Sequence, residues 1–211
     1  MDNCSPLKLK MKKTTPSCII YGELGRTPMA VSISARMIGF WERIVSGKRE
    51  KISYTLYNIL YKLDEGKVYH SKWINCIKDI LTKTGNVQFW TDQHVNVNFH
   101  LSMKVKKNLY ESFVENWKLQ VHNLSKCSNY RMYKTTFGFE NYLTILPQDL
   151  LYNVCRFRCS SHKLPIEKGR FLSIDRSERI CTLCNKHKMS DEFHYLFYCS
   201  HFTQVFTSRT N

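Results

Sequence analysis

The sequence predicts a mainly α fold, in which a helical body is followed by a small module that contains β and α elements. Two observations carry this prediction. Apolar residues recur at helical spacing in several segments between residues 29 and 160. Beyond them, strand-like alternation over residues 170–184 leads into a cluster of cysteines. We expect three regions, which are an irregular segment over residues 1–28, a helical body over residues 29–160 and the small module over residues 161–211.

Prolines and glycines mark the N-terminal segment as irregular. Three prolines and two glycines within it interrupt any long element, so only a short strand is expected there, over residues 18–22. Helices are then predicted over residues 29–47, 51–66 and 71–85. In the last of these helices, Ser71 suits the N-cap and Gly85 suits the position just past the C-terminus.

Apolar stripes define the clearest helices. The helix over residues 51–66 has an apolar stripe that is expected to face the core. The stripe consists of Ile52, Leu56, Ile59, Leu60 and Leu63. A polar connection over residues 86–99 precedes the longest helix, over residues 103–123, whose stripe consists of Val105, Leu109, Phe113, Trp117 and Val121. Two shorter helices are expected over residues 139–146 and 148–159, separated by Pro147.

The composition indicates a folded protein with a polyanionic partner. The chain has 211 residues, of which 43% are hydrophobic, and this content is enough for a sizeable core. Lysine and arginine number 32 against 17 acidic residues, which gives a formal charge of +15. Such a charge favours RNA or DNA as the partner, held largely through the phosphate backbone, over an anionic membrane. No motif indicates a small-molecule substrate.

The sequence lacks the signals of export and of membrane insertion. It contains no run of 18 apolar residues, and its N-terminus has no apolar region of the kind that secretory signals carry. We therefore expect a nuclear or cytoplasmic protein that is not secreted and has no membrane partner. In such a compartment, the nine cysteines are expected to be reduced thiols or metal ligands.

Four residues near the C-terminus have the spacing of zinc ligands. Cys181 and Cys184 have C-x2-C spacing, and His194 and Cys199 supply a second pair with H-x4-C spacing. The second pair is expected on a short helix that Ser190 caps. Four protein ligands leave no position for water, so the sequence predicts one structural Zn²⁺ ion without a catalytic role.

Other histidines and cysteines nearby offer alternatives. His201 can replace Cys199 as the fourth ligand, whereas His187 lies too close behind the first cysteine pair. Cys155 and Cys159 can extend a metal site, but their spacing of four residues also places them on one helix face. We favour the interpretation that this face is buried.

A basic segment leads into the cysteines. It carries the residues expected to bind nucleic acid, which are Arg156, Arg158, Lys163, Arg170, Arg176 and Arg179. Phenylalanines lie between them. Guanidinium groups suit phosphate oxygens, and exposed aromatic rings can stack on unpaired bases. Because this basic segment lies beside a zinc module in a chain of this charge, we interpret it as a binding surface and not as a merely solvated face.

Several segments together carry a family resemblance. They are YGELGR, RMIGFWERI, GFENYLTILP and the basic segment with its C-x2-C and H-x4-C pairs. From about residue 14 onward, the chain resembles the C-terminal region of the reverse transcriptases of LINE-type, non-LTR retrotransposons. This resemblance implies a helical segment that follows a polymerase core and ends in a CCHC zinc knuckle. The knuckle ligands would be Cys181, Cys184, His194 and Cys199.

The chain departs from that family at the polymerase centre. It contains no Tyr-x-Asp-Asp segment and no other carboxylate pair suited to two-metal nucleotidyl transfer, so we expect no enzyme activity. We expect the chain to be the tail of a longer element, and we expect this tail to bind nucleic acid. The alternative is a zinc-stabilised protein-interaction domain that binds no nucleic acid. A nuclease would need a carboxylate cluster, which the sequence does not indicate.

Overall fold

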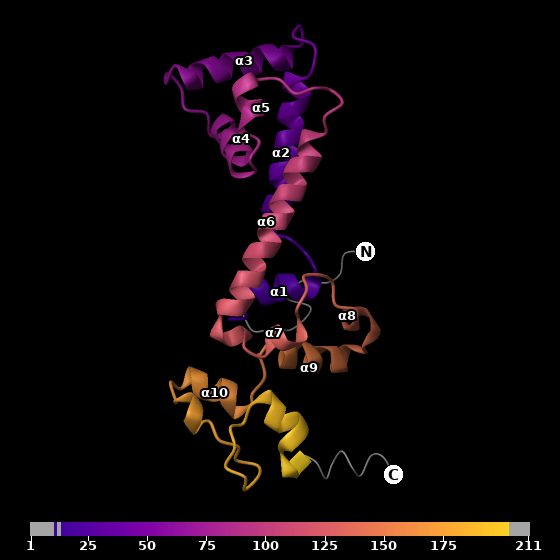
Figure 1. The fold of residues 1–211 in the computed structure, drawn as a ribbon, viewed down its shortest axis with the longest axis vertical. Coiled ribbons are helices and arrows are strands. Elements are labelled where there is room, and N and C mark those ends of the chain that lie inside the picture. The colour runs from indigo at the N-terminus through magenta and orange to yellow at the C-terminus, as the bar shows by residue number, and fades with distance from the viewer. Residues whose placement is uncertain (1–10, 12–13, 203–211) are drawn as a thin grey trace. The chain divides into compact units, whose positions relative to one another are not determined.

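The computed structural model describes residue 11 and residues 14–202 as helices joined by short loops (Figure 1). The chain divides into two compact units. The central unit comprises Thr27–Asn116, and the terminal unit combines the chain up to Arg26 with the chain from Trp117 onward. The expected boundary at residue 160 falls inside the terminal unit, and the expected helical body is divided between the two units.

The predicted mainly α fold is confirmed. The described residues form no β-strand, and they contain two isolated antiparallel bridges, which join Leu24 to Phe139 and Ile180 to Met189. The β element expected over residues 170–184 is therefore reduced to the second bridge. The helix α10, Pro165–Phe171, occupies the start of that segment, and a tight turn follows Ile180, so too few residues remain for a ladder.

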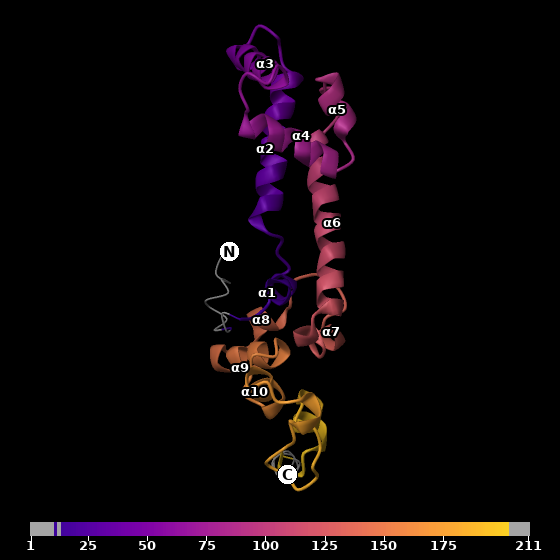
Figure 2. The same ribbon diagram turned by 90° about the vertical axis from the view of Figure 1, so that its left-hand side faces the viewer.

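Four helices and the first part of a fifth build the central unit. They are α2 Met29–Val45, α3 Ile52–Glu65, α4 Lys72–Lys83, α5 Val87–Asp92 and α6 Leu101–Asn123, which continues into the terminal unit. The first turns of α6 run antiparallel to α2, and α3 lies across the C-terminal end of α2 (Figure 1 and Figure 2). The core of this unit consists of Ile38, Trp41, Ile44, Val45, Tyr57, Ile74, Ile77, Leu81, Trp90, Val95, Leu101 and Val105.

Local signals fix the ends of α4. The Ile74 N–H donates to Ser71 Oγ at 3.4 Å, and Gly85 has a φ of +68° past the C-terminus, as predicted for both residues. The short helix α5 was not predicted, because its segment reads as a polar connection. Trp90 is buried in the core and holds α5 there.

The apolar stripe predicted for α3 is wrong at three of its five residues, while Leu60 packs against the core and Leu63 is half-buried. Ile52, Leu56 and Ile59 are 77%, 57% and 50% exposed, whereas Tyr57 is buried. The Tyr57 hydroxyl accepts a hydrogen bond of 2.9 Å from Trp41 Nε1. Because the core beneath α3 is rich in aromatic rings and contains this indole N–H group, a tyrosine fits it better than an aliphatic side chain.

The helix α1, Ser17–Leu24, replaces the short strand and the irregular structure expected near the N-terminus. Pro16 precedes it, and Gly25 ends it with a φ of +58°. A Cβ at Gly25 would lie 2.2 Å from the backbone nitrogen of Phe139, so this close approach requires glycine. Buried residues occur all around α1, which therefore lacks the stripe that identifies a surface helix.

Short elements make up the rest of the terminal unit. They are the 3-10 turn η1 Ser125–Cys127, α7 Tyr130–Tyr133, α8 Tyr142–Ile145, α9 Gln148–Arg158, α10, the 3-10 turn η2 Arg176–Glu178 and the π-helical turn η3 His194–Tyr198. Pro147 separates α8 from α9 as predicted. Cys155 and Cys159 are buried, which confirms the favoured interpretation of this pair. In the described part of the chain, no helix is long and apolar enough to cross a membrane.

Candidate metal centre and neighbouring basic cavities

Cys181 and Cys184 lie on a tight turn that backbone hydrogen bonds hold in place. The Cys181 N–H donates to the Lys188 carbonyl oxygen at 2.9 Å, next to the isolated bridge that begins at Ile180. Within the turn, the Leu183 N–H donates to Cys181 Sγ at 3.4 Å. The loop is thus closed at its base, and its first sulfur atom already accepts a backbone hydrogen bond.

A π-helical turn brings His194 and Cys199 together. The Cys199 N–H donates to the His194 carbonyl oxygen at 2.7 Å, and this i to i+5 bond closes one wide turn. In an α-helix the two side chains would point about 140° apart around the axis. The predicted cap is wrong by one residue, because Asp191 Oδ1, and not Ser190, accepts the His194 N–H at 2.8 Å.

The four candidate ligands form one compact cluster. Their ligand atoms all lie within 4.8 Å of one another. Cys181 Sγ lies 3.8 Å from Cys199 Sγ, and Cys184 Sγ lies 3.3 Å from His194 Nε2. Tetrahedral zinc with Zn–S bonds of about 2.3 Å would hold two sulfur atoms about 3.8 Å apart. The cluster therefore has the dimensions of a four-coordinate metal site.

The environment of the cluster shifts the pKa values of the Cys181 and Cys199 thiols in opposite directions. Burial raises the pKa of the Cys181 thiol, but the N–H groups of Leu183 and Cys184 outweigh this effect, and the pKa falls to about 6. Burial raises the pKa of the Cys199 thiol. A metal ion held by both sulfur atoms would have to displace the Cys199 proton, so metal binding and proton release are coupled.

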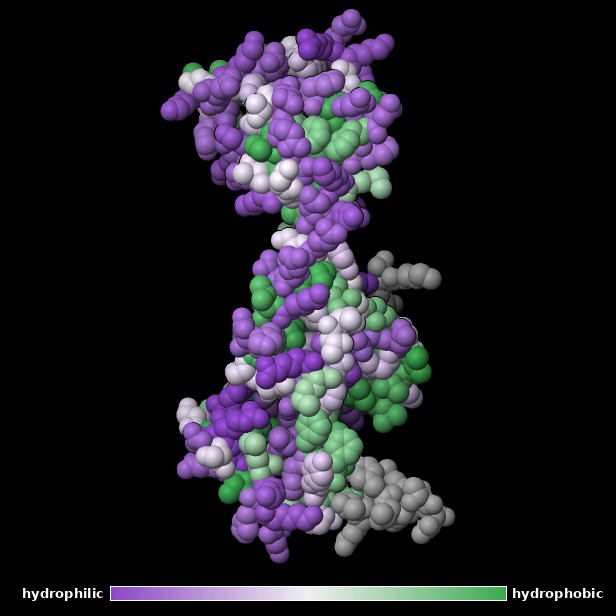
Figure 3. Space-filling view, viewed as in Figure 1, coloured by the Kyte–Doolittle hydropathy of each residue, from purple (hydrophilic) through white to green (hydrophobic). Residues whose placement is uncertain are grey.

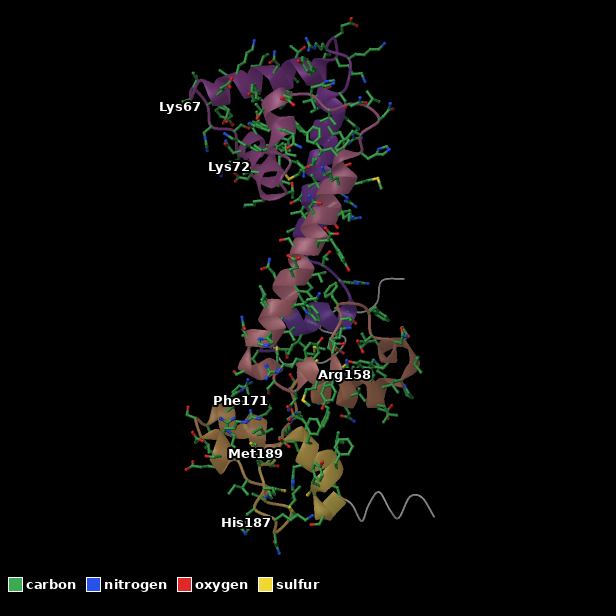
Figure 4. All side chains as sticks on the ribbon, in the orientation of Figure 1. Lys67, Lys72, Arg158, Phe171, His187 and Met189 are labelled. Atoms are coloured by element: carbon green, nitrogen blue, oxygen red, sulfur yellow. The ribbon has the colours of Figure 1, made fainter. Side chains whose placement is uncertain are left out.

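Neither alternative histidine belongs to this cluster. His187 is exposed at the outer end of the loop that separates the two ligand pairs, with a φ of +46° (Figure 4). His201 is also exposed, and its ring centroid lies 4.9 Å from that of Phe202. Among the described residues, the group of mutually close ligand atoms contains Cys199 and excludes both histidines.

Glu192 fastens the metal cluster to the rest of the terminal unit. Its side chain is buried, with an exposure of 1%. Glu192 Oε1 lies 2.7 Å from His162 Nε2 and accepts a hydrogen bond of 3.3 Å from Ser160 Oγ. Glu192 Oε2 accepts a hydrogen bond from Asn129 Nδ2. Sequence patterns did not reveal this role, because the nearest of these partners is 30 residues away.

Arg158 does not belong to the exposed basic surface that the sequence predicts. Its guanidinium group binds Glu23 and Glu140 inside the terminal unit, with its Nη2 at 3.1 Å and 3.0 Å from the two carboxylates (Figure 4). The guanidinium also lies 5.0 Å from the ring centroid of Tyr142. We therefore remove Arg158 from the candidate nucleic-acid contacts, since its charge is compensated within the protein.

Three other predicted basic residues, Arg170, Arg176 and Arg179, line one cavity of about 230 Å³, whose wall also contains Glu167 and Glu192. Arg170 Nη2 donates to Glu167 Oε2 at 2.9 Å, and Arg179 Nη1 donates to the Ile166 carbonyl oxygen at 2.9 Å. These bonds hold both side chains against α10. Arg176 is exposed and forms no ion pair with a described residue, so its guanidinium group remains available to an anion.

The last two predicted residues, Arg156 and Lys163, line a separate cavity of about 660 Å³. Phe157 and His162 contribute to the same cavity, and their ring centroids lie 5.6 Å apart. Cations and aromatic rings thus occur in one concave surface. The predicted basic segment is therefore divided among two cavities and the internal ion pairs of Arg158 with Glu23 and Glu140.

The terminal unit accordingly combines a compact group of metal-ligating atoms with two cavities whose walls carry cationic side chains. The first feature can hold a metal ion, and the second can bind phosphate or carboxylate groups. Comparisons of the chain with protein-family models, with curated proteins and with solved structures found no match.

Proposed function

We propose that the terminal unit is a nucleic-acid-binding module stabilised by one structural Zn²⁺ ion. The donor set of three cysteines and one histidine suits zinc, which prefers sulfur and nitrogen ligands in tetrahedral geometry. A bound zinc ion would crosslink the turn at Cys181 to the π-helical turn at His194. With four protein ligands, it would have no open position for water, and its role would be structural.

The observation that carries the proposal is the pair of basic cavities beside the metal cluster. Arg176 is exposed in one of them, and Lys163 is exposed in the other. Guanidinium and ammonium groups bind phosphate oxygens, and Phe157 lies where an unpaired base can reach an aromatic ring. Contacts of this kind position a nucleic acid and contribute affinity, but they carry little sequence information.

In this proposal, the chain corresponds to the region that follows the polymerase core in LINE-type reverse transcriptases. The YGELGR segment and the CCHC spacing support that assignment. The module would hold template RNA or target DNA while a separate catalytic core carries out synthesis.

Binding of fluorescent RNA and DNA oligonucleotides by the full chain, at several salt concentrations, tests the proposal. The dissociation constant should rise steeply with salt, because phosphate contacts release counterions. Arg176→Gln and Lys163→Gln should each weaken binding and reduce the slope of log Kd against log salt by about 1. Lys83→Gln, which removes an exposed charge from α4 in the central unit, is the matched control.

A second candidate function has one observation in its favour. Apolar side chains remain exposed over α8 and α9, where Ile145 is 74% and Leu150 is 50% exposed (Figure 3). Such a patch suits a protein partner. A chain that binds one zinc ion but retains no oligonucleotide at low salt would contradict the nucleic-acid proposal and favour this zinc-stabilised protein-interaction module.

A further inference from the structure

The central unit contains a groove of about 760 Å³ between α2 and the first turns of α6. Its volume falls within the range of roughly 300–1,000 Å³ that is typical of ligand sites. Small side chains form much of its wall, and they are Ser32, Ala35, Gly39, Ser46 and Ser102. Gly39 allows the two helices to approach closely, because a Cβ there would lie 3.3 Å from Ser102 Cβ.

Cationic side chains surround this groove. The basic residues that line it are Arg36, Arg43, His100 and Lys106. Arg36, His100 and Lys106 are exposed, and none of the three forms an ion pair with a described residue. Arg43 Nε donates to the Gly39 carbonyl oxygen at 3.2 Å, which orients the guanidinium group along the groove wall.

Glu42 is the one acidic residue in the groove, and its charge is already compensated. Glu42 Oε1 accepts the Leu101 N–H at 2.7 Å, and Glu42 Oε2 accepts the Ser102 N–H at 3.1 Å. The carboxylate thus caps the N-terminus of α6, a helix of 23 residues whose dipole places partial positive charge at that end. Glu42 forms no ion pair with a described cation, and Arg36, Arg43 and Lys106 outnumber it, so the groove keeps a net positive charge.

We propose that this groove binds the phosphodiester backbone of a nucleic-acid strand. Cations from both helices and the hydroxyl groups of three serines outnumber the two large apolar side chains of the wall, Val97 and Met103, and match a polyanion better than an apolar ligand. The inference does not rest on the function proposed for the terminal unit, because every residue that lines the groove belongs to the central unit. It assigns a second, zinc-independent contact with nucleic acid.

A double variant of the full chain, Arg36→Gln with Lys106→Gln, tests the inference in the same oligonucleotide assay. We expect affinity at low salt to fall roughly tenfold and the slope of log Kd against log salt to fall by about 2, because two phosphate contacts are lost. The matched control is Lys62→Gln with Lys83→Gln, which removes two exposed charges from α3 and α4 outside the groove. Far-UV circular dichroism and thermal unfolding establish that both variants are folded.

A groove variant that binds like the control pair would overturn the inference, even if Arg176→Gln and Lys163→Gln weaken binding. Conversely, a loss confined to the groove variant would support it while contradicting the proposal for the terminal unit. Photo-crosslinking of an oligonucleotide containing 4-thiouridine gives a second readout. Peptides that contain Arg36 or Lys106 should carry the crosslink, and their absence among the crosslinked peptides would count against the groove.

Discussion

Arg158 lies 3.1 Å from Glu23, which is 135 residues away in the sequence. The carboxylate of Glu23 is fully buried, and it also accepts a hydrogen bond from the Tyr142 hydroxyl. Glu140 binds the same guanidinium group and accepts a hydrogen bond from Lys134. This network therefore joins α1, α9 and the segment before α8 within the terminal unit. Its geometry accounts for Arg158 structurally, without a nucleic-acid ligand.

Arg158→Met should destabilise the protein strongly, because it leaves the Glu23 carboxylate buried without its cation. The expected cost is about 3–5 kcal/mol, measured by urea unfolding monitored by circular dichroism. Arg176→Met, at an exposed arginine of the same unit, should change the free energy of unfolding by less than about 0.5 kcal/mol. Adding Glu23→Gln to Arg158→Met should recover part of the loss, since the unpaired charge is removed. Equal stabilities for the two arginine variants would contradict the role assigned to this pair.

Glu192→Gln should loosen the attachment of the metal cluster without removing a ligand. The carboxylate accepts hydrogen bonds from Asn129 and Ser160 and lies against His162, and an amide can satisfy only part of this set. We expect a loss of about 1.5–3 kcal/mol in the free energy of unfolding and an unchanged metal content. Glu178→Gln, at an exposed glutamate of η2, serves as the control. Loss of metal from the Glu192 variant would mean that Glu192 supports the ligands directly.

The metal cluster could be predicted from the sequence because its determinants are local. Cys181 and Cys199 are 18 residues apart, and the spacing within each ligand pair reflects the turn that the pair occupies. The cap residue was misassigned because the turn at His194 is π-helical, and sequence periodicity does not distinguish that turn from an α-helical one.

The long-range contacts could not be predicted in this way. Nothing near Glu23 or Glu192 indicates that either carboxylate is buried, because each partner comes from a distant segment. The buried face of α3 is predicted only in part for a related reason. Aliphatic periodicity points to Leu56 as well as to Leu60, which does pack against the core, whereas an indole N–H elsewhere in the unit selects Tyr57. Periodicity identifies an amphipathic helix, but the chemistry of the surface beneath it decides which face is buried.

Tyr57→Phe should destabilise the central unit, because it leaves the Trp41 Nε1–H group buried without an acceptor. The expected cost is about 1–3 kcal/mol, compared with little change for Tyr69→Phe at a position that is 55% exposed. Urea unfolding measures both differences. If the Tyr57 variant lost no more stability than the Tyr69 variant, the indole N–H would have found another acceptor.

The same tyrosine should make stability depend on alkaline pH. Burial raises the pKa of Tyr57 from 10.0 to about 12 in the folded protein. The folded state therefore binds the proton more tightly than the unfolded state does. This contribution is complete below pH 10 and is lost as the pH rises toward 12. In Tyr57→Phe, the free energy of unfolding should not show this part of the decline with rising pH. Parallel curves of unfolding free energy against pH for the variant and the parent protein would contradict the assignment.

Removal of the metal should unfold the segment from Cys181 to Cys199. This segment contains few long-range backbone hydrogen bonds, so a bound ion would provide most of its stability. Native mass spectrometry should find one zinc ion per chain, and the thiols of Cys181, Cys184 and Cys199 should resist alkylation until a chelator is added. Hydrogen exchange should then accelerate in peptides of this segment and remain slow in α4 of the central unit.

Substitution of single residues identifies the ligands. Cys199→Ser should lower zinc affinity roughly 100-fold or more, because it removes one of four ligand atoms that lie within 4.8 Å of one another. Cys76→Ser, at an exposed cysteine on α4, should leave affinity unchanged and controls for the loss of a thiol. His201→Ala should also bind zinc normally, since His201 lies outside the cluster. If His201→Ala lost the metal while Cys199→Ser retained it, the fourth ligand would be His201, and the cluster described around Cys199 would not be the metal site.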